Sequence, residues 1–395
     1  MGCMNVCPVQ AITTEYYSDG HRGISVNPDV CIECGACERV CPVVNGSEYG
    51  KNTLDSEYYA GWATQQDIRR RGATSGIFGA LAERVISEGG YVAGAVMEGM
   101  ACRYIISNKY EDIERMQGSK YTSSDPGCVY KEIRSKLSEG REVLFCGLPC
   151  HVAGLLEYLP ARMRENLTTV DIICGGVSSP SLIRRYAEHV GDMEAIISFR
   201  DKSSGWKPTG FRYSLKYIDK DSNVVDTSAK GRNLITDGFA CELTDRYSCY
   251  DCRFSFTHRK SDLTIGDLWG DTEFKDQHFN GVSGIIAHSE KGREQLAKAG
   301  IELHPITPER LLCNNYRIFN GKSIKGRFPE RRWLAYALHH LSYDSLLKIY
   351  GSDLKPIRLL WIPFTAYRLL SFRFAEFLNK RRGKQLLKQI GSKKY

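Results

Sequence analysis

Val143-Leu-Phe-Cys146-Gly-Leu-Pro-Cys150-His151 reads as a buried strand that stops at glycine and proline and is followed directly by a helix. Thr169-Val-Asp-Ile-Ile-Cys174-Gly-Gly has the same form, and Ser179-Pro180 begins its helix. Strands that alternate with helices predict a parallel sheet, whose ligands lie beyond the carboxyl ends of the strands. Cys150 and Cys174 are therefore expected at a ligand site.

The same alternation extends in both directions, from residue 58 to residue 300. Tyr58–Trp62, Tyr91–Met97 and Arg103–Ser107 have the composition of strands, and Asp125-Pro126 should start a helix that Gly140 ends. The sequence thus predicts an α/β core, with a mixed or parallel sheet and flanking helices, over residues 58–300.

A glycine-rich turn, Gly72-Ala-Thr74-Ser75-Gly76, precedes a helix with one apolar face (Ile77, Leu81 and Val85). Thr74 or Ser75 is the expected N-cap, and Gly89-Gly90 the expected end. Such a turn leaves backbone N–H groups free to hold a phosphate. Tight turns with a serine cap are also common without any ligand, so both interpretations stay open here.

Another cysteine pair, Cys249-Tyr-Asp-Cys252, precedes the strand-like run Asp262–Gly270. Its C-x2-C spacing suits iron–sulfur, zinc or a dithiol redox pair. Together with Cys150 and Cys174 it would supply four thiolates for one iron–sulfur cube. Cys146 and Cys241 are reserve ligands, and buried structural roles are expected for the remaining unpaired cysteines, which are Cys102, Cys128 and Cys313.

The N-terminal segment has a different pattern, Cys31-Ile-Glu-Cys34-Gly-Ala-Cys37-Glu-Arg-Val-Cys41-Pro42. This is the C-x2-C-x2-C-x3-C-P run of bacterial ferredoxins, in which the fourth cysteine serves the other cluster. Cys3-Met-Asn-Val-Cys7-Pro8 is the tail of a second such run. Cys7 would complete the first cube. We therefore predict a small α+β ferredoxin-like 4Fe–4S module over residues 1–50, whose metal ligands are Cys3, Cys7, Cys31, Cys34, Cys37 and Cys41.

The second cube of this module would have only Cys41 and Cys3 as ligands, because its other two cysteines should stand just before Met1. Either the start of the chain is misplaced inside a longer module, which we favour, or one cluster has been lost. A zinc site is the alternative for the whole run. Zinc sites usually separate their cysteine pairs by a dozen or more residues, so the close spacing favours a cube.

Composition agrees with a globular protein that has a sizeable core: 395 residues, 42% hydrophobic and 25% charged. The tightest groups among the fifteen cysteines have metal-ligand spacing, so a reducing, cytoplasmic location is expected rather than disulfides. The longest apolar run, near Leu359–Phe364, is broken by Pro363 and is far shorter than the ~20 residues of a membrane span.

The net charge of +8 belongs to the C-terminus, because residues 353–395 contain eleven Lys or Arg and two acidic residues, a balance of +9. Residues 305–395 are expected to be helical and to end in this basic tail. Its helically spaced aromatic and leucine side chains could contact an anionic membrane surface or an acidic partner, or could pack on the protein itself. No nucleic-acid recognition motif accompanies the charge.

Seven segments of residues 58–300 resemble the beta-subunit family of coenzyme F420 hydrogenases and dehydrogenases, in its bacterial branch with a fused ferredoxin module. They begin at Gly72, Met116 (Met-Gln-Gly-Ser-Lys-Tyr121), Gly147, Asp171, Phe199 (Phe-Arg-Asp-Lys202), Cys249 and Asp262. The resemblance implies a flavoprotein in which FAD lies beside an iron–sulfur cube. Carried onto this chain, it implies a flavin-phosphate site formed by Gly72, Thr74, Ser75, Gly76, Ser119 and Lys120, and a cube held by Cys150, Cys174, Cys249 and Cys252.

Two candidate catalytic residues follow from the same resemblance. Lys120 would neutralise flavin phosphate or stabilise reduced flavin, and His151 would donate a proton, with a surface lysine and a packed histidine as the plain alternatives. His151 stands where glutamine is frequent in the family, and Gly175 where the bacterial branch often has histidine. Both differences place the identity of the substrate in doubt.

The expected function is that of an iron–sulfur flavoprotein oxidoreductase, exchanging electrons with a ferredoxin-like or other redox partner and acting on a small-molecule substrate or coenzyme, of the F420 type or another hydride acceptor. One or two cubes are expected in the N-terminal module and one in the core. The rival hypothesis is a non-catalytic relay or redox-sensing adaptor that docks through its basic tail.

Overall fold

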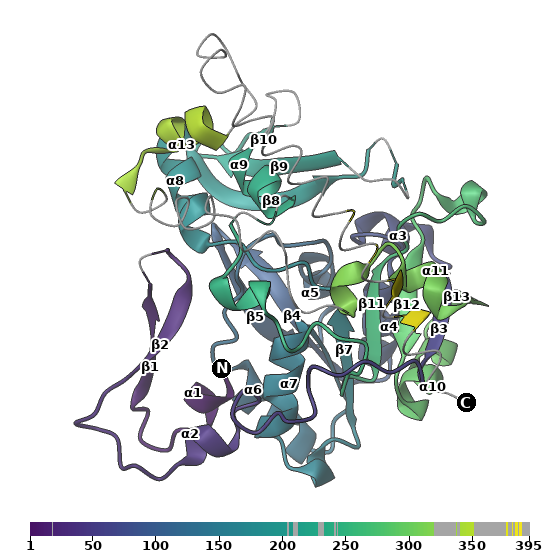
Figure 1. Ribbon diagram of the computed structural model, residues 1–395, viewed down its shortest axis with the longest axis horizontal. Helices are drawn as coiled ribbons and strands as arrows, with labels where there is room; N and C mark the ends of the chain where they lie inside the picture. Colours follow the sequence, from purple (N-terminus) through teal and green to yellow (C-terminus); the bar gives the residue numbers. More distant parts are fainter. Residues whose placement is uncertain are drawn as a thin grey trace.

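The computed structural model describes residues 1–319 apart from 18, 204, 208–211, 228–232, 241 and 243, together with 337, 340–350 and a few positions between 377 and 388. An eight-stranded mixed sheet forms its centre (Figure 1). In spatial order its strands are β13 (Ile301–Pro305), β3 (Glu57–Ala63), β12 (Ser283–Ala287), β11 (Leu263–Asp267), β7 (Leu167–Ile172), β6 (Val143–Gly147), β4 (Tyr91–Glu98) and β5 (Ala101–Ser107).

The four central strands, β11, β7, β6 and β4, are parallel, and the strands on both sides of them are antiparallel. Val143 and Phe145 of β6 are buried with residues of two helices on one face, while Leu144 is buried on the other face. This alternation is the period-two pattern of a strand covered on both sides. The predicted fold class of the core, a mixed sheet with flanking helices, is confirmed.

The helices form a layer on each face of the sheet. One layer contains α4 (Ile77–Ser87), α5 (Tyr110–Met116) and α10 (Glu290–Lys298), and α3 (Gln66–Arg71) packs beside α4. The other layer contains α6 (Val129–Ser138) and α7 (Pro149–Tyr158). Helix α6 was expected to start at Pro126 but begins three residues later, at Val129. Pro126 belongs instead to a turn, in which its carbonyl oxygen accepts a hydrogen bond from the Val129 N–H.

A second, three-stranded antiparallel sheet lies against the first and has its own apolar core. Its strands are β8 (Met193–Asp201), β9 (Arg212–Asp219) and β10 (Val224–Asp226), and the helices around it are α8 (Pro180–Val190), α9 (Leu234–Ala240) and α13 (Tyr343–Tyr350). Helix α8 begins at Ser179-Pro180, as expected, and the Ser179 side chain caps it by accepting a hydrogen bond from the Ser181 N–H.

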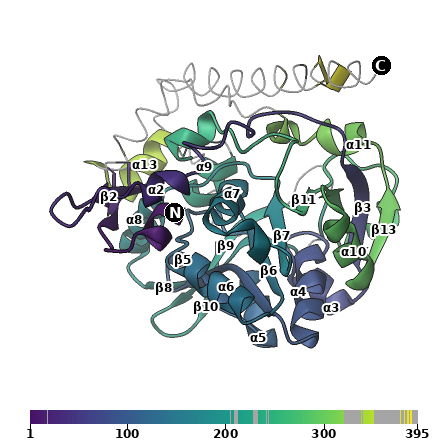
Figure 2. The same ribbon diagram turned by 90° about the horizontal axis from the view of Figure 1, so that it is seen from below.

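The N-terminal module consists of α1 (Gly2–Val6), the hairpin of β1 (Ile12–Tyr16) and β2 (Arg22–Val26), and α2 (Ala36–Arg39). It projects from the main body beside α7, as both views show in purple (Figures 1 and 2). Helix α1 packs against α7, and Arg22 forms an ion pair of 2.5 Å with Asp125. The predicted module is therefore fixed to the core.

The chain continues past the sheet with α11 (Pro308–Leu312), and β13 extends the sheet beyond residue 300. The predicted basic tail, residues 353–395, lies outside the described residues except for isolated positions. No helix in the described part of the chain combines the length and the apolar composition that a bilayer crossing requires.

Candidate functional site

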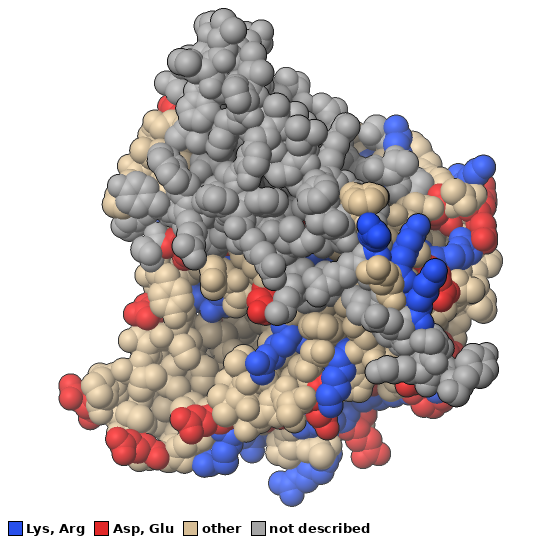
Figure 3. Space-filling view, viewed as in Figure 1, with Lys and Arg blue, Asp and Glu red and all other residues tan. Residues whose placement is uncertain are grey.

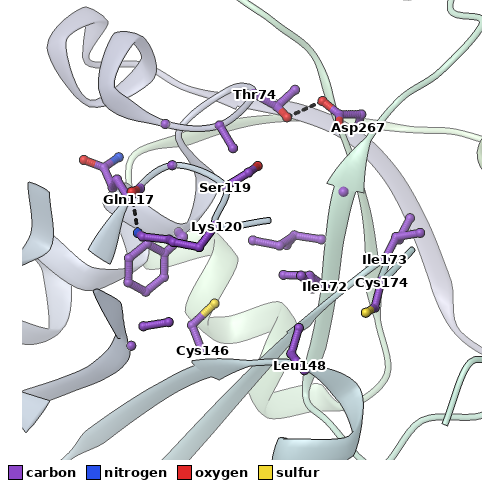
Figure 4. Close-up of a pocket in the computed structure, with 18 of the residues that line it drawn as sticks. Thr74, Gln117, Ser119, Lys120, Cys146, Leu148, Ile172, Ile173, Cys174 and Asp267 are labelled. Carbon is purple, nitrogen blue, oxygen red and sulfur yellow. Dashed lines mark hydrogen bonds between the residues drawn. The ribbon is translucent and has the colours of Figure 1, made fainter. Parts of the chain in front are cut away.

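A cavity of about 370 Å³ opens beyond the carboxyl ends of the parallel strands, where ligands of such sheets bind (Figure 4). It is lined by two glycine-containing loops, by the ends of β6, β7 and β11, and by side chains from β5 and β8. All six residues that the resemblance assigns to the flavin phosphate line it, namely Gly72, Thr74, Ser75, Gly76, Ser119 and Lys120.

The first loop, Gly72–Gly76, turns tightly between α3 and α4. Gly76 is in the left-handed conformation, with φ of 82°, and a Cβ there would come within 2.9 Å of the Arg69 backbone. A Cβ on Gly72 would come within 2.8 Å of Gly76. Only glycine therefore fits both positions. The fold of this loop directs the N-terminus of α4 toward the cavity.

The prediction that Thr74 or Ser75 caps the N-terminus of α4 is wrong. Gly76 occupies that position, and no side chain caps the helix. The Ser75 hydroxyl instead donates to the Gly61 carbonyl oxygen at 2.8 Å and is hydrogen-bonded to the Ser283 hydroxyl at 2.6 Å, and Thr74 donates to Asp267. Both hydroxyl groups tie the loop to the sheet, which sequence alone could not distinguish from capping.

Lys202, to which the sequence assigned no role, holds the same loop from the opposite side. Its ammonium group donates to the carbonyl oxygens of Arg69 at 3.0 Å, Gly72 at 2.9 Å and Thr74 at 2.6 Å. Burial lowers the pKa of Lys202 to about 8. All three ammonium hydrogens are used, so Lys202 fixes the loop backbone.

Lys120 holds the second loop in the same way. Its ammonium group donates to the carbonyl oxygens of Arg115 at 2.9 Å, Met116 at 2.7 Å and Gln117 at 2.7 Å, at the C-terminus of α5. Burial lowers its pKa to about 8. Contact with a phosphate would require one of these bonds to break. Lys120 therefore has a structural role that the prediction of a phosphate or flavin contact did not include.

Arg200 and Asp267 join the two loops to the two sheets. Arg200 forms an ion pair of 3.1 Å with Asp267 and donates to the Ser119 hydroxyl at 3.3 Å. Asp267 also accepts from the Trp206 indole at 2.8 Å and from Thr74. The segments at Phe199 and Asp262 contain this pair, but sequence alone did not indicate that the two residues meet.

His151 does not line the cavity. Its Nδ1 lies 3.0 Å from the hydroxyl group of Tyr104, which does line it. Burial lowers the pKa of His151 to about 3, so its imidazole is neutral at neutral pH. The geometry shows no direct path from His151 to the cavity, and its predicted role in proton donation would have to act through Tyr104.

The structure brings together four cysteines that are far apart in sequence. Cys150 is in the first turn of α7, Cys174 follows β7, and Cys249 and Cys252 lie in and just after a 3₁₀ turn (Tyr247–Tyr250). Every one of the six pairs interacts electrostatically. Burial is the main cause that raises the pKa of Cys150 to about 12 and that of Cys174 to about 11, and the neighbouring thiols add to it.

Charges of both signs lie next to this group of four thiols, since the Asp245 carboxylate also acts on Cys174 and Cys249. Arg317 donates to the Cys249 carbonyl oxygen at 3.0 Å, and its charge acts on the thiols of Cys174 and Cys249. Among the described residues, no three His, Cys, Asp or Glu side chains are grouped closely enough to bind a single metal ion. A cube attaches each thiolate to a different iron, so its ligands lie further apart than those of one ion.

The other cysteines take different positions. Cys146 lines the cavity, and its sulfur points into it below Lys120 (Figure 4). Cys102 is buried, as expected, and also lines the cavity. The expectation of burial is wrong for Cys128, which is exposed, and Cys313 is only partly buried. The reserve ligand Cys241 lies outside the described residues.

In the N-terminal module, Cys3 lies in α1 and Cys7 ends it, while Cys37 is in α2 and Cys41 follows it. Cys31 and Cys34 are exposed in the loop before α2. Helix α1, which carries Cys3, packs against α6 and α7 of the core. Burial is the main cause that raises the pKa of the Tyr130 hydroxyl, and Tyr104, Cys150 and Cys3 add to it. Tyr130 also donates to the His151 carbonyl oxygen at 2.7 Å.

Comparison with known protein families matches three parts of the chain. Residues 58–127 match the N-terminal region, and residues 140–309 the C-terminal region, of the coenzyme F420 hydrogenase/dehydrogenase beta subunit. Together these two regions cover more than half of the chain. Residues 1–45 match a 4Fe–4S dicluster domain.

Individual relatives agree with these matches. One subunit of the F420H2 dehydrogenase of Methanosarcina mazei is 29% identical over 192 residues, 44% of this chain and 50% of that protein. A 7Fe ferredoxin of Hydrogenibacillus schlegelii is 51% identical over 41 residues, 10% of this chain and 46% of the relative. The chain spans about half of the length of these relatives.

One solved structure, of the F420-reducing [NiFe] hydrogenase complex from Methanosarcina barkeri, aligns over 75% of this chain and 93% of that chain, with a TM-score of 0.44 and 16% sequence identity. The two regional matches are to one type of protein, occur in its order, and enclose both loops of the cavity and all four clustered cysteines. The chain therefore belongs to the coenzyme F420 hydrogenase/dehydrogenase beta-subunit family, with a 4Fe–4S dicluster domain at its N-terminus.

Proposed function

We propose that this protein is an oxidoreductase that passes electrons between 4Fe–4S clusters and an organic substrate or coenzyme, through FAD bound in the cavity. One observation carries the proposal: Cys174 belongs both to the group of four thiols and to the lining of the cavity. A cluster on these thiols would lie at the edge of the cavity. This juxtaposition favours an enzyme over a relay or adaptor without a substrate site.

The residues around the cavity suit a flavin nucleotide. The loop at Gly72–Gly76 and the N-terminus of α4 offer backbone N–H groups to a phosphate. A Cβ on Gly118 would meet no atom within 4 Å, so a ligand could approach that backbone closely. Thr122 Oγ1 and Gln117 Oε1 are buried polar atoms of the lining that make no hydrogen bond in the described structure. A bound ligand would satisfy them.

The four clustered cysteines suit an iron–sulfur cube. A buried thiol resists ionisation, and four adjacent thiolates would repel one another, unless iron compensates their charge. Arg317 adds positive charge beside Cys174 and Cys249. Charge and hydrogen bonding near the sulfurs set the reduction potential of such a cluster. We therefore assign Cys150, Cys174, Cys249 and Cys252 as its ligands.

The positions of the remaining cysteines suggest the order of transfer. Cys31 and Cys34 are exposed at the surface of the N-terminal module, and Cys3 lies on α1, which packs against α6 and α7, the helices that carry Tyr130 and Cys150. Electrons would cross from the module to the core at Tyr130, and would then reach Cys174 and the cavity. FAD, when bound, supplies the conversion between single electrons and a hydride.

The protein's own residues provide positioning. Lys202 and Lys120 fix the two loops through their backbone carbonyls, and the pair of Arg200 and Asp267 connects the loops to both sheets. Tyr104 lines the cavity, and its hydroxyl group bonds the neutral His151. The substrate is proposed only as a hydride acceptor or donor of the F420 type or another small organic molecule.

The proposal is tested by anaerobic reconstitution of the full chain with iron, sulfide and FAD, followed by Cys174→Ser. The wild type should bind about one flavin per chain, and the variant should lose about four irons. Electrons supplied to the N-terminal module should then no longer reduce the flavin, although dithionite still should. Cys313→Ser, at a partly buried cysteine outside the group, is the control. Unchanged iron in Cys174→Ser, or a wild type that binds no flavin, would contradict the proposal.

A further inference from the structure

The N-terminal module exposes far more large apolar side chains than its size explains. Of the fifteen large hydrophobic residues that are exposed in the described part of the chain, eight lie between residues 16 and 44. They are Tyr16, Tyr17, Ile24, Val26, Val30, Ile32, Val43 and Val44. Isolated exposed apolar residues are normal in soluble proteins, but a concentration of them marks an interaction site.

The register of the hairpin places several of these side chains on one face. Val26 pairs with Ile12, Ile24 with Thr14, and Arg22 with Tyr16. Residues that face each other across an antiparallel pair project to the same side, as do residues two apart on one strand. Tyr16, Ile24 and Val26 therefore share a face and are all exposed, whereas Ile12 and Arg22 on the same face are covered by the rest of the protein.

The loop that follows β2 continues the apolar character to the cysteines. Val30 and Ile32, which flank Cys31, are 42% and 60% exposed. Glu33 and Cys34 are exposed as well, so the whole run from Val30 to Cys34 is at the surface. We call the face of Tyr16, Ile24 and Val26 together with the run Val30–Cys34 the outer module surface.

The charge of the module is opposite to that of the whole chain. Residues 1–45 contain five acidic residues and two arginines, a balance of −3, whereas the chain carries +8. Of the arginines, Arg22 is paired with Asp125 and Arg39 donates to the Cys34 carbonyl oxygen at 2.9 Å. In Figure 3 the module, at the lower left, is mostly uncharged with acidic side chains along its edge.

We propose that the outer module surface docks an electron-carrying protein whose own contact face is apolar with a basic rim. The inference rests on the proposed function, because it requires a cluster behind this surface. An apolar centre excludes water from the contact, and a rim of charges attracts an oppositely charged partner and orients it. The partner would exchange single electrons with the cube next to Cys31 and Cys34, without any covalent step.

Cytochrome c, which is small and basic, serves as the probe. The reconstituted full chain is reduced anaerobically with one equivalent of dithionite, and the transfer of an electron from the reduced cluster to the ferric haem is followed by stopped flow. We expect the second-order rate constant to fall about tenfold or more between low and high salt, as electrostatic steering is screened. Acidic flavodoxin should react more slowly, with the opposite dependence on salt.

Glu33→Lys should lower the cytochrome c rate about threefold to tenfold, and the matched exposed control on α5, Glu111→Lys, should not. Ile24→Ser, at a position away from the cysteines, should lower the rate of electron transfer to cytochrome c at every salt concentration. If Glu33→Lys loses iron, Ile24→Ser is the variant that tests the docking surface. An uncharged quinone reports the basal transfer of electrons. Wild type that reduces neither acceptor contradicts the proposed function. If the wild type reduces the quinone and both variants transfer electrons to cytochrome c as fast as Glu111→Lys does, the proposed docking surface is wrong and the proposed function is not affected.

Discussion

Gly2 of α1 and Gly154 of α7 meet backbone to backbone, since a Cβ on Gly2 would come within 3.3 Å of the Gly154 carbonyl oxygen. Two glycines let the N-terminal module and the core approach more closely than side chains would allow. The contact lies one helical turn from Cys150 and next to Cys3, the two thiols whose charges act on Tyr130. The distance between the N-terminal module and the core thus depends on a contact between two glycines, which have no side chains.

We expect Gly154→Leu to slow the transfer of electrons from the module to the core. A Cβ at position 154 would already lie 3.2 Å from the Tyr130 hydroxyl, and leucine would push α1 or Tyr130 away. The free energy of unfolding should fall by about 1–3 kcal/mol, as for other overpacked sites. Stopped-flow measurement of flavin reduction, with electrons supplied through the module, checks the rate.

The control for Gly154→Leu is Ala161→Leu, at an exposed position just beyond the end of α7. It adds the same side chain without approaching the module. If both variants retained the transfer rate of the wild type and bound the same amount of iron, the contact between Gly2 and Gly154 would not set the coupling.

Lys202→Met should loosen the loop Gly72–Gly76 and weaken the binding of FAD. The substitution removes three charge-assisted hydrogen bonds to carbonyl oxygens and leaves those oxygens without their buried donor. Loss of about 1–3 kcal/mol of binding free energy corresponds to a dissociation constant about 5 to 150 times higher. Fluorescence titration of the apoprotein with FAD measures it.

Lys207→Met is the matched control, because Lys207 is exposed and lies five residues away in the chain. It should leave FAD affinity unchanged. Equal affinities for the two variants would mean that the loop keeps its shape without Lys202, and that the ammonium group does not position the flavin site.

The sequence predicted the parts of the site whose chemistry depends on residue type and spacing. The cysteines that follow two apolar strands, Cys150 and Cys174, were expected at the carboxyl edge of the sheet, and the structure brings them together with Cys249 and Cys252. Spacing carries this information because strand direction fixes where each chain segment leaves the sheet.

What sequence could not predict depends on partners that are distant in the chain. Ser75 resembles a helix cap until its bonds to Gly61 and Ser283 are seen, and Lys120 resembles a free cation until its three carbonyl partners are seen. Lys202 acts on residues about 130 positions earlier. Local patterns contain no record of such contacts, so the groups that shape the cavity were found only in the structure.

His288 should make the core less stable in mild acid. Its ring lies between Ser56, at 2.9 Å, and Thr264, at 2.8 Å, and burial lowers its pKa to about 3, with further contributions from Arg259 and His258. As the pH falls below about 6.5 the unfolded chain binds a proton at this residue and the folded protein does not, so the free energy of unfolding falls, by at most about 1.4 kcal/mol per pH unit, until the pH approaches 3. His288→Gln should reduce this slope, measured by urea unfolding between pH 7 and pH 4.5, whereas His304→Gln, at a half-buried histidine, should not. Parallel slopes for the wild type and both variants would show that His288 does not remain neutral in the folded protein over this range.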